Sequence, residues 1–460
     1  MFTEIEKLEY KTAERSKRSN KENKFNLLDI PVIKKLLLAK AFPYAIQTVI
    51  LLVLIGFILL GRGVYTPEGQ DVELFAKSNI VCMVIWGIWW PLMIWTVVIF
   101  GRLWCMICPL ELMSRIGGKI GLLLRIKTFS ISRPVKAGFI IVGLYALIQL
   151  LAAGTGLHYV PAYTALFLTC LITFAMIIGV VFKSGTFCRG FCPIAMTLNA
   201  YSRGSMLAVR AGSANKCAEC KAKSCIRTSE NKSIFKSGGG CPVNLYPPHL
   251  KSNKDCVLCG QCIKSCKSSN MQLLIRLPFN KKDRREKRAS WAFTLFIMID
   301  SGFVLGEICE QWDFTDKIFM AVPEYFMNYF NFQGYSGWIE GVWTLFIFPL
   351  LLWTIMGIFL KSTGGLKSII HSWRAFAFRA VIIFSSLHLI KSFLRFAEWS
   401  AFLPYAVKDP RGINNAKAFS SGALLYPQSV FNPFIILAIS IVILCFALYF
   451  FLREKHTGNI

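Results

Sequence analysis

The chain has 460 residues, of which 55% are hydrophobic and 17% charged, and it carries 52 Lys and Arg against 25 Asp and Glu. A basic chain with so apolar a composition is typical of a nucleic-acid binder or of a membrane protein. Long uncharged runs favour the membrane, because about 20 consecutive apolar residues suffice for a helix to cross a bilayer. We therefore expect contact with a lipid bilayer and no binding of nucleic acid.

The fold class that these runs predict is a mainly α-helical, polytopic membrane protein with about eight spans. The runs cover about 43–61, 79–100, 137–156, 160–182, 289–308, 341–360, 373–394 and 430–452. The fifth and seventh are weaker, since Asp300 interrupts one and Arg379 and His388 the other. Most Lys and Arg fall on the side of the N-terminus, so the positive-inside rule predicts that both termini are cytoplasmic, in a bacterial inner membrane.

Four parts follow along the chain. Residues 1–42 form a basic N-terminal segment, and the pattern within 27–40 predicts a surface helix there. Residues 43–210 hold four spans, residues 211–288 are polar and Cys-rich, and residues 289–460 hold four more spans. The first membrane part contains a repeat, because two spans lead to "CMICPLELMSR" and two more to "CRGFCPIAMTLNAYSR". Parallel repeats of this kind place equivalent residues around a pseudo-two-fold axis.

The Cys-rich part predicts two [4Fe-4S] clusters. The run "CVLCGQCIKSC" has the C-x2-C-x2-C-x3-C spacing of bacterial ferredoxins, in which the fourth Cys ligates the other cluster. A looser set of four lies upstream, and crossed ligation pairs the two sets. One cluster is assigned Cys217, Cys220, Cys225 and Cys266, and the other Cys256, Cys259, Cys262 and Cys241. Structural zinc is the alternative, because four Cys also suit Zn²⁺.

The repeated Cys-Pro motifs predict a further site at the cytoplasmic edge of the bilayer. The four cysteines are Cys105, Cys108, Cys188 and Cys192. If the repeats meet, the four thiolates could bind an iron–sulfur cluster or a soft metal such as Cu(I). They could also cycle between dithiol and disulfide, or simply fill gaps in a helical bundle.

These motifs, four spans and a two-cluster segment together resemble the NapH/NosR/CcoG-type membrane-bound ferredoxins, over roughly residues 43–275. The resemblance implies electron transfer, with the paired Cys motifs and the eight cysteines of the Cys-rich segment as site residues. NapH- and NosR-like members are taken to oxidise quinol and supply periplasmic reductases, whereas CcoG-like members reduce copper during oxidase assembly.

Charged residues inside spans are costly in lipid and are therefore candidates for function. A quinol site needs a proton acceptor and a hydrogen-bond donor, and His388 and Asp300 would suit those roles. A buried ion pair between spans is the simpler alternative, and His158 with His388 could instead ligate haem b. The aromatic segment 309–338 predicts an interfacial helix, or else a surface for a periplasmic partner.

The expected function is a relay of electrons between the quinone pool and a respiratory redox partner, as an electron-transfer subunit or a quinol dehydrogenase-like oxidoreductase. Two alternatives remain open. One is a copper reductase or assembly factor for a membrane metalloenzyme, and the other is a transporter or pump that uses the clusters as a redox driver.

Overall fold

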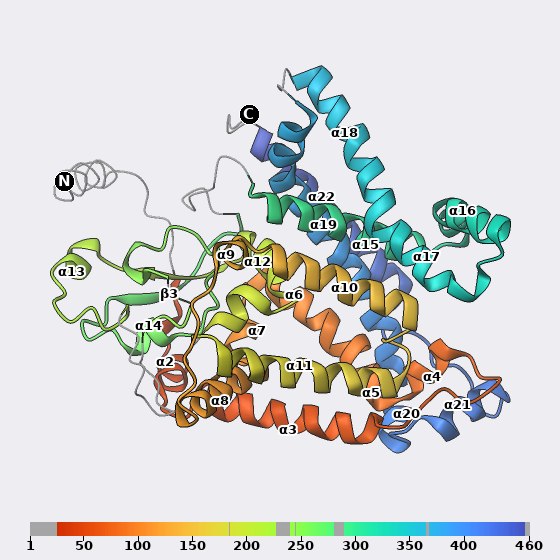
Figure 1. Cartoon of the computed structure of the whole chain (residues 1–460), viewed down its shortest axis with the longest axis horizontal. Coiled ribbons are helices and arrows are strands. Elements are labelled where there is room, and N and C mark those ends of the chain that lie inside the picture. The colour runs from red at the N-terminus through yellow and green to blue at the C-terminus, as the bar shows by residue number, and fades with distance from the viewer. Residues whose placement is uncertain are drawn as a thin grey trace.

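The computed structural model describes residues 25–183, 185–226, 240–243, 245–279, 289–364 and 368–455. The molecule is 71% helix, and its long helices pack side by side in a bundle (Figure 1). By length and composition, seven of the described helices could cross a membrane: α3 (Tyr44–Gly61), Ile80–Phe100, α11 (Pro161–Val181), α15 (Trp291–Cys309), Ser336–Thr363, α19 with its extension (Ile369–Lys408) and α22 (Pro433–Lys455). The predicted polytopic helical fold is thereby confirmed.

Two of these helices are composite, and an eighth apolar helix is shorter. Ile80–Phe100 joins α5 (Ile80–Cys82), a π-helical stretch (Met83–Trp89) and α6 (Trp90–Phe100). Ser336–Thr363 joins α17 (Ser336–Val342), a π-helical stretch (Trp343–Ile347) and α18 (Phe348–Gly364). The run expected at 137–156 is α10 (Phe139–Thr155), whose 17 residues reach about 25 Å.

A small antiparallel sheet caps one end of the bundle. Its strands are β1 (Phe25–Asn26), β2 (Leu207–Ala211) and β3 (Met271–Ile275), in the order β1-β3-β2. This end, which we call the sheet end, also carries α13 (Ala214–Ala218) and α14 (Gln261–Lys264). The opposite or far end carries α4 (Val72–Ser78), α20 (Leu403–Lys408) and α21 (Ile413–Ser420) (Figure 1).

The remaining helices lie at the sheet end or beside the bundle. They are α2 (Pro31–Leu38), α7 (Leu103–Met106), α8 (Pro109–Leu123), α9 (Arg133–Ala137), α12 (Ala195–Tyr201) and α16 (Asp313–Phe330). Within the span Ile369–Lys408, α19 itself covers Ile369–Trp399. Helix α2 lies within 27–40 and confirms the surface helix predicted there. It is mostly exposed, except for Leu37, which packs against the apolar core beneath the sheet. Residues 1–24 of the basic segment lie outside the described residues.

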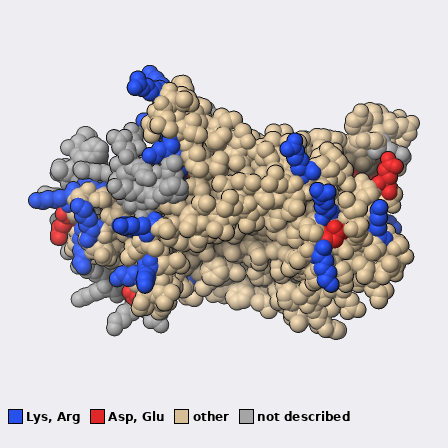
Figure 2. Space-filling model, turned by 90° about the horizontal axis from the view of Figure 1, so that it is seen from below, with Lys and Arg blue, Asp and Glu red and all other residues tan. Residues whose placement is uncertain are grey.

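Charge is distributed as a membrane protein requires. Figure 2 shows Lys and Arg gathered toward the two ends of the molecule, with a broad band between them on this face that carries neither acidic nor basic side chains. Apolar side chains on α22 and α3 remain exposed in this band, where only lipid could cover them without cost. The exposed apolar surface is therefore the lipid-facing surface.

The two spans with interrupted apolar runs are the most buried. In α15 and α19 the apolar window is 61% and 67% buried, against 39% or less in the other five spans. Polar side chains inside lipid must face protein partners. Both helices lie in the centre of the bundle. The polar side chains Asp300 and His388, which interrupt their apolar runs, therefore face protein and not lipid.

The segment expected to form an interfacial helix contains α16. Its side chains Phe314, Ile318, Tyr325 and Tyr329 are all well exposed. They leave an aromatic and apolar surface next to the end of α15. Such a surface suits a helix lying in the lipid headgroup region.

Glycines hold α8 against α11, and so bring the two Cys-Pro repeats together. A Cβ on Gly117 would lie 2.1 Å from the carbonyl oxygen of Met176, and one on Gly179 would lie 2.0 Å from that of Ser114. Small residues let membrane helices approach to backbone contact. Helix α8 follows the first Cys pair and α11 precedes the second, so this contact positions both pairs.

Replacing Gly179 with Ala should therefore destabilise the bundle, by about 1–3 kcal/mol or more for such overpacking. Thermal unfolding in detergent, followed by tryptophan fluorescence, should show a lower midpoint temperature. The control is Gly143→Ala in α10, where an added Cβ meets nothing within 4 Å. Equal midpoints for the two variants would contradict the close packing.

Candidate sulfur sites

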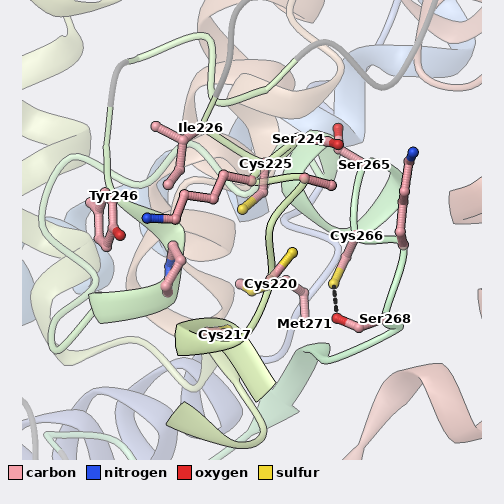
Figure 3. Close-up of a pocket in the computed structure, with 14 residues that line it drawn as sticks. Cys217, Cys220, Ser224, Cys225, Ile226, Tyr246, Ser265, Cys266, Ser268 and Met271 are labelled. Carbon is pink, nitrogen blue, oxygen red and sulfur yellow. Dashed lines mark hydrogen bonds between the residues drawn. The ribbon is translucent and has the colours of Figure 1, made fainter. Parts of the chain in front are cut away.

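Four cysteines line a cavity under the sheet, and we call them the outer cysteine site. They are Cys217, Cys220, Cys225 and Cys266. The cavity holds about 430 Å³ of space not filled by protein atoms. Figure 3 shows the sulfurs of Cys220, Cys225 and Cys266 turned toward the same space. Residues almost 50 positions apart in sequence thus line one cavity.

Four other cysteines line a second cavity, and we call them the inner cysteine site. They are Cys241, Cys256, Cys259 and Cys262. This cavity holds about 320 Å³ and is otherwise lined by apolar side chains such as Val243, Leu245 and Leu258. The two cavities therefore divide the eight cysteines into the same crossed sets that the spacing assigns.

Asn270 holds two sulfurs of the outer cysteine site. Its backbone N–H donates to Cys266 Sγ at 3.2 Å, and its side-chain amide donates to Cys217 Sγ at 3.1 Å. The same amide is fixed by two hydrogen bonds to the backbone of Ser213. Burial tends to raise the pKa of Cys266, but donors from Ser268 and the backbone outweigh it and lower that pKa. These donors thus favour the thiolate form of Cys266, whereas burial raises the pKa of Cys225 in the same site.

The backbone around the inner cysteine site also presents N–H groups to sulfur. Leu258 and Gly260 have φ values of 50° and 69°, in the left-handed region. Turns that pass between right- and left-handed residues aim successive N–H groups at one point, and so favour an anion there. Leu245 N–H donates to Cys241 Sγ at 3.4 Å. The strained backbone at Leu258 is of the kind found at functional sites.

The cysteines of the two sites do not form a compact ligand set for a single ion. Across the described ranges, no three His, Cys, Asp or Glu side chains are grouped so that they could hold one metal ion. A tetrahedral zinc needs four ligands converging on one atom, whereas a [4Fe-4S] cubane takes its thiolates on separate irons.

The paired Cys-Pro motifs meet beside the inner cysteine site, and we call them the bundle-end quartet. The four are Cys105, Cys108, Cys188 and Cys192, and they interact electrostatically with one another. In both repeats the second Cys precedes a proline that opens a helical segment, so that backbone N–H groups of the first turn point at its sulfur. Burial raises the pKa of Cys192 to about 12. Burial thus favours the neutral thiol at Cys192, against the opposing charge of Arg102.

Two apolar clusters connect the three sulfur sites. Cys262 of the inner cysteine site belongs to an apolar cluster against which Cys225 and Cys266 of the outer cysteine site pack. Cys241 belongs to another, against which Cys105 of the bundle-end quartet packs. The inner cysteine site is therefore the link between the other two.

A buried cation lies between the inner cysteine site and the bundle-end quartet. Arg102 is only 4% exposed, and it interacts with Cys105, Cys188, Cys192 and Cys256. Burial alone would lower its pKa, but the neighbouring thiolates raise it instead. Its positive charge thus favours negative charge on both sites at once.

The two residues predicted for a quinol site come together through a tyrosine. Tyr201 at the end of α12 donates to Asp300 Oδ2 at 2.7 Å, and its oxygen lies 3.0 Å from His388 Nδ1. Tyr145 of α10 donates to Asp300 Oδ1 at 3.0 Å. We call these four residues the carboxylate cluster. All of them are buried in the middle of the bundle.

The other charges of these spans form an ion pair, as the simpler alternative predicts. Lys391 contacts Glu307, and Arg395 lies 3.9 Å from the same carboxylate. The rings of His158 and Tyr159 are tilted against each other, with centroids 3.9 Å apart. No described contact joins His158 to His388.

Several residues of these sites carry no signal that sequence reasoning could use. In the sequence, Arg102 looks like an ordinary basic residue at the end of a span. Asn270 looks like a loop residue before a strand. Tyr145 and Tyr201 read as aromatic positions in apolar helices. Only their contacts with cysteines or with Asp300 distinguish them.

Comparison with known proteins adds no relative. No protein-family model, no curated protein and no solved structure matches this chain. The interpretation of the three sulfur sites therefore depends on the residues and their geometry.

Proposed function

We propose that this protein is a membrane-bound iron–sulfur electron-transfer protein. The observation that carries the proposal is the pair of cavities, each lined by four cysteines in the crossed sets of a two-cluster ferredoxin. The outer and inner cysteine sites would each hold one [4Fe-4S] cluster, and these clusters would supply one-electron carriers. The chain itself contributes thiolates, N–H donors to sulfur and an apolar lining that limits water.

The bundle-end quartet extends this relay to the membrane. Cys105 of this quartet packs against the apolar cluster that contains Cys241 of the inner cysteine site, so a further iron–sulfur cluster or a soft metal at the quartet would be next in line for electrons. The order of contact then runs from the outer cysteine site through the inner one to the bilayer. The resemblance to NapH/NosR/CcoG-type ferredoxins, in the paired Cys-Pro motifs, points the same way.

The quinone pool is the electron source or sink that we propose. Quinol oxidation needs a buried proton acceptor within the bilayer. His388 Nε2 is buried without a hydrogen-bond partner, and Asp300 lies one tyrosine away. These two residues are the proposed acid–base groups of a quinol site. The complete protein would then act as an electron-transfer subunit or a quinol dehydrogenase-like oxidoreductase.

The proposed location is a bacterial inner membrane, with the sheet end and both termini in the cytoplasm. The Lys and Arg content of the segments at that end supports this orientation through the positive-inside rule. The far end would then face the periplasm. A redox protein docking there, or at the cysteine-bearing end, is the proposed partner.

One observation favours a second function. Four thiols at a membrane edge form a donor set that selects Cu(I). Electrons delivered to them from the neighbouring inner cysteine site could reduce copper there, as the CcoG-like resemblance implies. The protein would then be a metal reductase or assembly factor for a membrane metalloenzyme.

The test is anaerobic purification with iron and acid-labile sulfide assays, followed by EPR of the reduced protein. Two clusters give about eight irons per chain, and a third at the bundle-end quartet gives about twelve. Zinc without sulfide would overturn the proposal. Reduction of the EPR signals by a quinol supports the quinone role, whereas Cu(II) reduction with no response to quinol supports the alternative.

Replacing Asn270 with Leu should weaken one cluster and spare the other. The substitution keeps the side-chain size but removes the amide donor to Cys217 Sγ and leaves Ser213 without its partner. We expect loss of about half the iron on brief exposure to air. The comparison is Asn414→Leu, the same change at an exposed position of α21 at the far end of the bundle. Equal iron retention in both variants would contradict this role.

A further inference from the structure

The carboxylate cluster is a buried acid with no paired cation. Asp300 is fully buried, and His388 is 1% exposed. Both oxygens of Asp300 accept hydrogen bonds from tyrosine hydroxyls. Within the described residues Asp300 makes no ion pair, whereas Glu307 on the same helix is paired with Lys391. A lone carboxylate in a membrane interior is costly and marks a functional position.

The hydrogen bonds fix where each proton lies. Tyr201 has a single hydroxyl proton and donates it to Asp300, so its oxygen accepts from His388 Nδ1–H. A neutral His388 then has a bare Nε2, which is buried and finds no partner in the described structure. A proton added at that nitrogen would make an imidazolium linked through Tyr201 to the Asp300 carboxylate. The cluster would change from a net negative charge to neutral.

Helix α12 joins this cluster to the bundle-end quartet. It begins three residues after Cys192 and ends at Tyr201, so its seven residues rise about 10 Å. Cys192 and Tyr201 belong to the same buried core. In mid-helix, Asn199 exchanges two hydrogen bonds with Asp255, the residue before Cys256 of the inner cysteine site. One short rigid element therefore contacts both sulfur sites and the acid.

The charges nearest the cluster belong to one ion-paired group. On α19 the nearest charge to His388 is Lys391, which opposes a proton on the imidazole, whereas Glu307 of α15, paired with Lys391, favours one. Arg395 lies beside the same glutamate. Among the described residues, α10 and α12 contribute the two tyrosines. At a separation near the length of α12, an added electron at the quartet would act on the cluster through an interior of low dielectric, where such interactions are strong.

We propose that the carboxylate cluster takes up one proton when the bundle-end quartet is reduced by one electron. This inference rests on the proposed function, because it requires a redox group at the quartet. The electron comes from a reduced cluster of the inner cysteine site, or from dithionite in the test. The proton comes from water and forms the N–H bond at His388 Nε2. The protein thereby links electron transfer to proton movement within the membrane.

The test is redox titration of the purified protein, followed by EPR at several pH values. The relevant signal is the one that disappears in Cys108→Ser. One proton per electron changes the reduction equilibrium tenfold per pH unit, which corresponds to about 59 mV for one electron. We expect this slope in the wild type and its loss in Asp300→Asn. Tyr201→Phe removes one hydroxyl only and should also flatten the slope, should the first variant fail to fold.

The control is Asp313→Asn, an exposed acid on α16, which should keep the wild-type slope. A pH-independent potential in the wild type overturns this inference alone and leaves the relay intact. A wild-type slope retained in both cluster variants also overturns it. Absence of any signal that depends on Cys108 overturns both the inference and the redox role of the quartet.

Discussion

Replacing Cys241 with Ser should abolish the same EPR signal as replacing Cys259, and should leave the signal that depends on Cys217. The reason is the crossed arrangement, in which Cys241 and Cys259 line one cavity and Cys217 and Cys266 the other. Cys266→Ser should accordingly remove the signal that Cys217 controls, although Cys266 belongs to the same run as Cys259. Each variant should lose about four of the eight irons.

The matched controls are Cys170→Ser and Cys445→Ser, which alter exposed cysteines on the membrane helices. Both should keep the full iron content and both signals. If Cys266→Ser instead removed the signal of Cys259, each run would ligate its own cluster, and the crossed assignment would be wrong. Iron analysis with EPR of the reduced variants decides between these outcomes.

Replacing Arg102 with Gln should make both the inner cysteine site and the bundle-end quartet harder to reduce. Arg102 is buried and interacts with cysteines of both sites. A buried cation stabilises each added electron, and in an interior of effective dielectric near 20 its removal costs about 1.4 kcal/mol or more at each site. This is a tenfold change in the reduction equilibrium, or about 59 mV for one electron.

Arg102→Lys keeps the charge and should retain most of the wild-type potential. Lys127→Gln removes an exposed charge from a loop and should leave both potentials unchanged, because solvent screens it. The outer cysteine site serves as an internal control, since no described contact joins its cysteines to Arg102. A drop in iron content with unchanged potentials would show that Arg102 acts only on folding.

The amino-acid sequence by itself determined the membrane architecture. Apolar runs of spanning length need no tertiary information, because each helix satisfies its own backbone hydrogen bonds within lipid. The positions of the spans were predicted closely, down to the two weaker ones. The weakness of α15 and α19 was itself informative, since polar residues in a span require a protein environment. The crossed grouping of the eight cysteines also followed from spacing alone.

Tertiary structure alone decided what surrounds the predicted site residues. The approach of α8 to α11, which depends on backbone contact at Gly179, brings the two Cys-Pro motifs together. Arg102 is buried between two sulfur sites, and Asn270 donates hydrogen bonds to two sulfurs. Both arrangements depend on segments far apart in sequence. The link from Asp300 to His388 likewise passes through Tyr201, on a third helix. Such contacts arise from packing between elements, whereas spacing and periodicity report only what lies within one element.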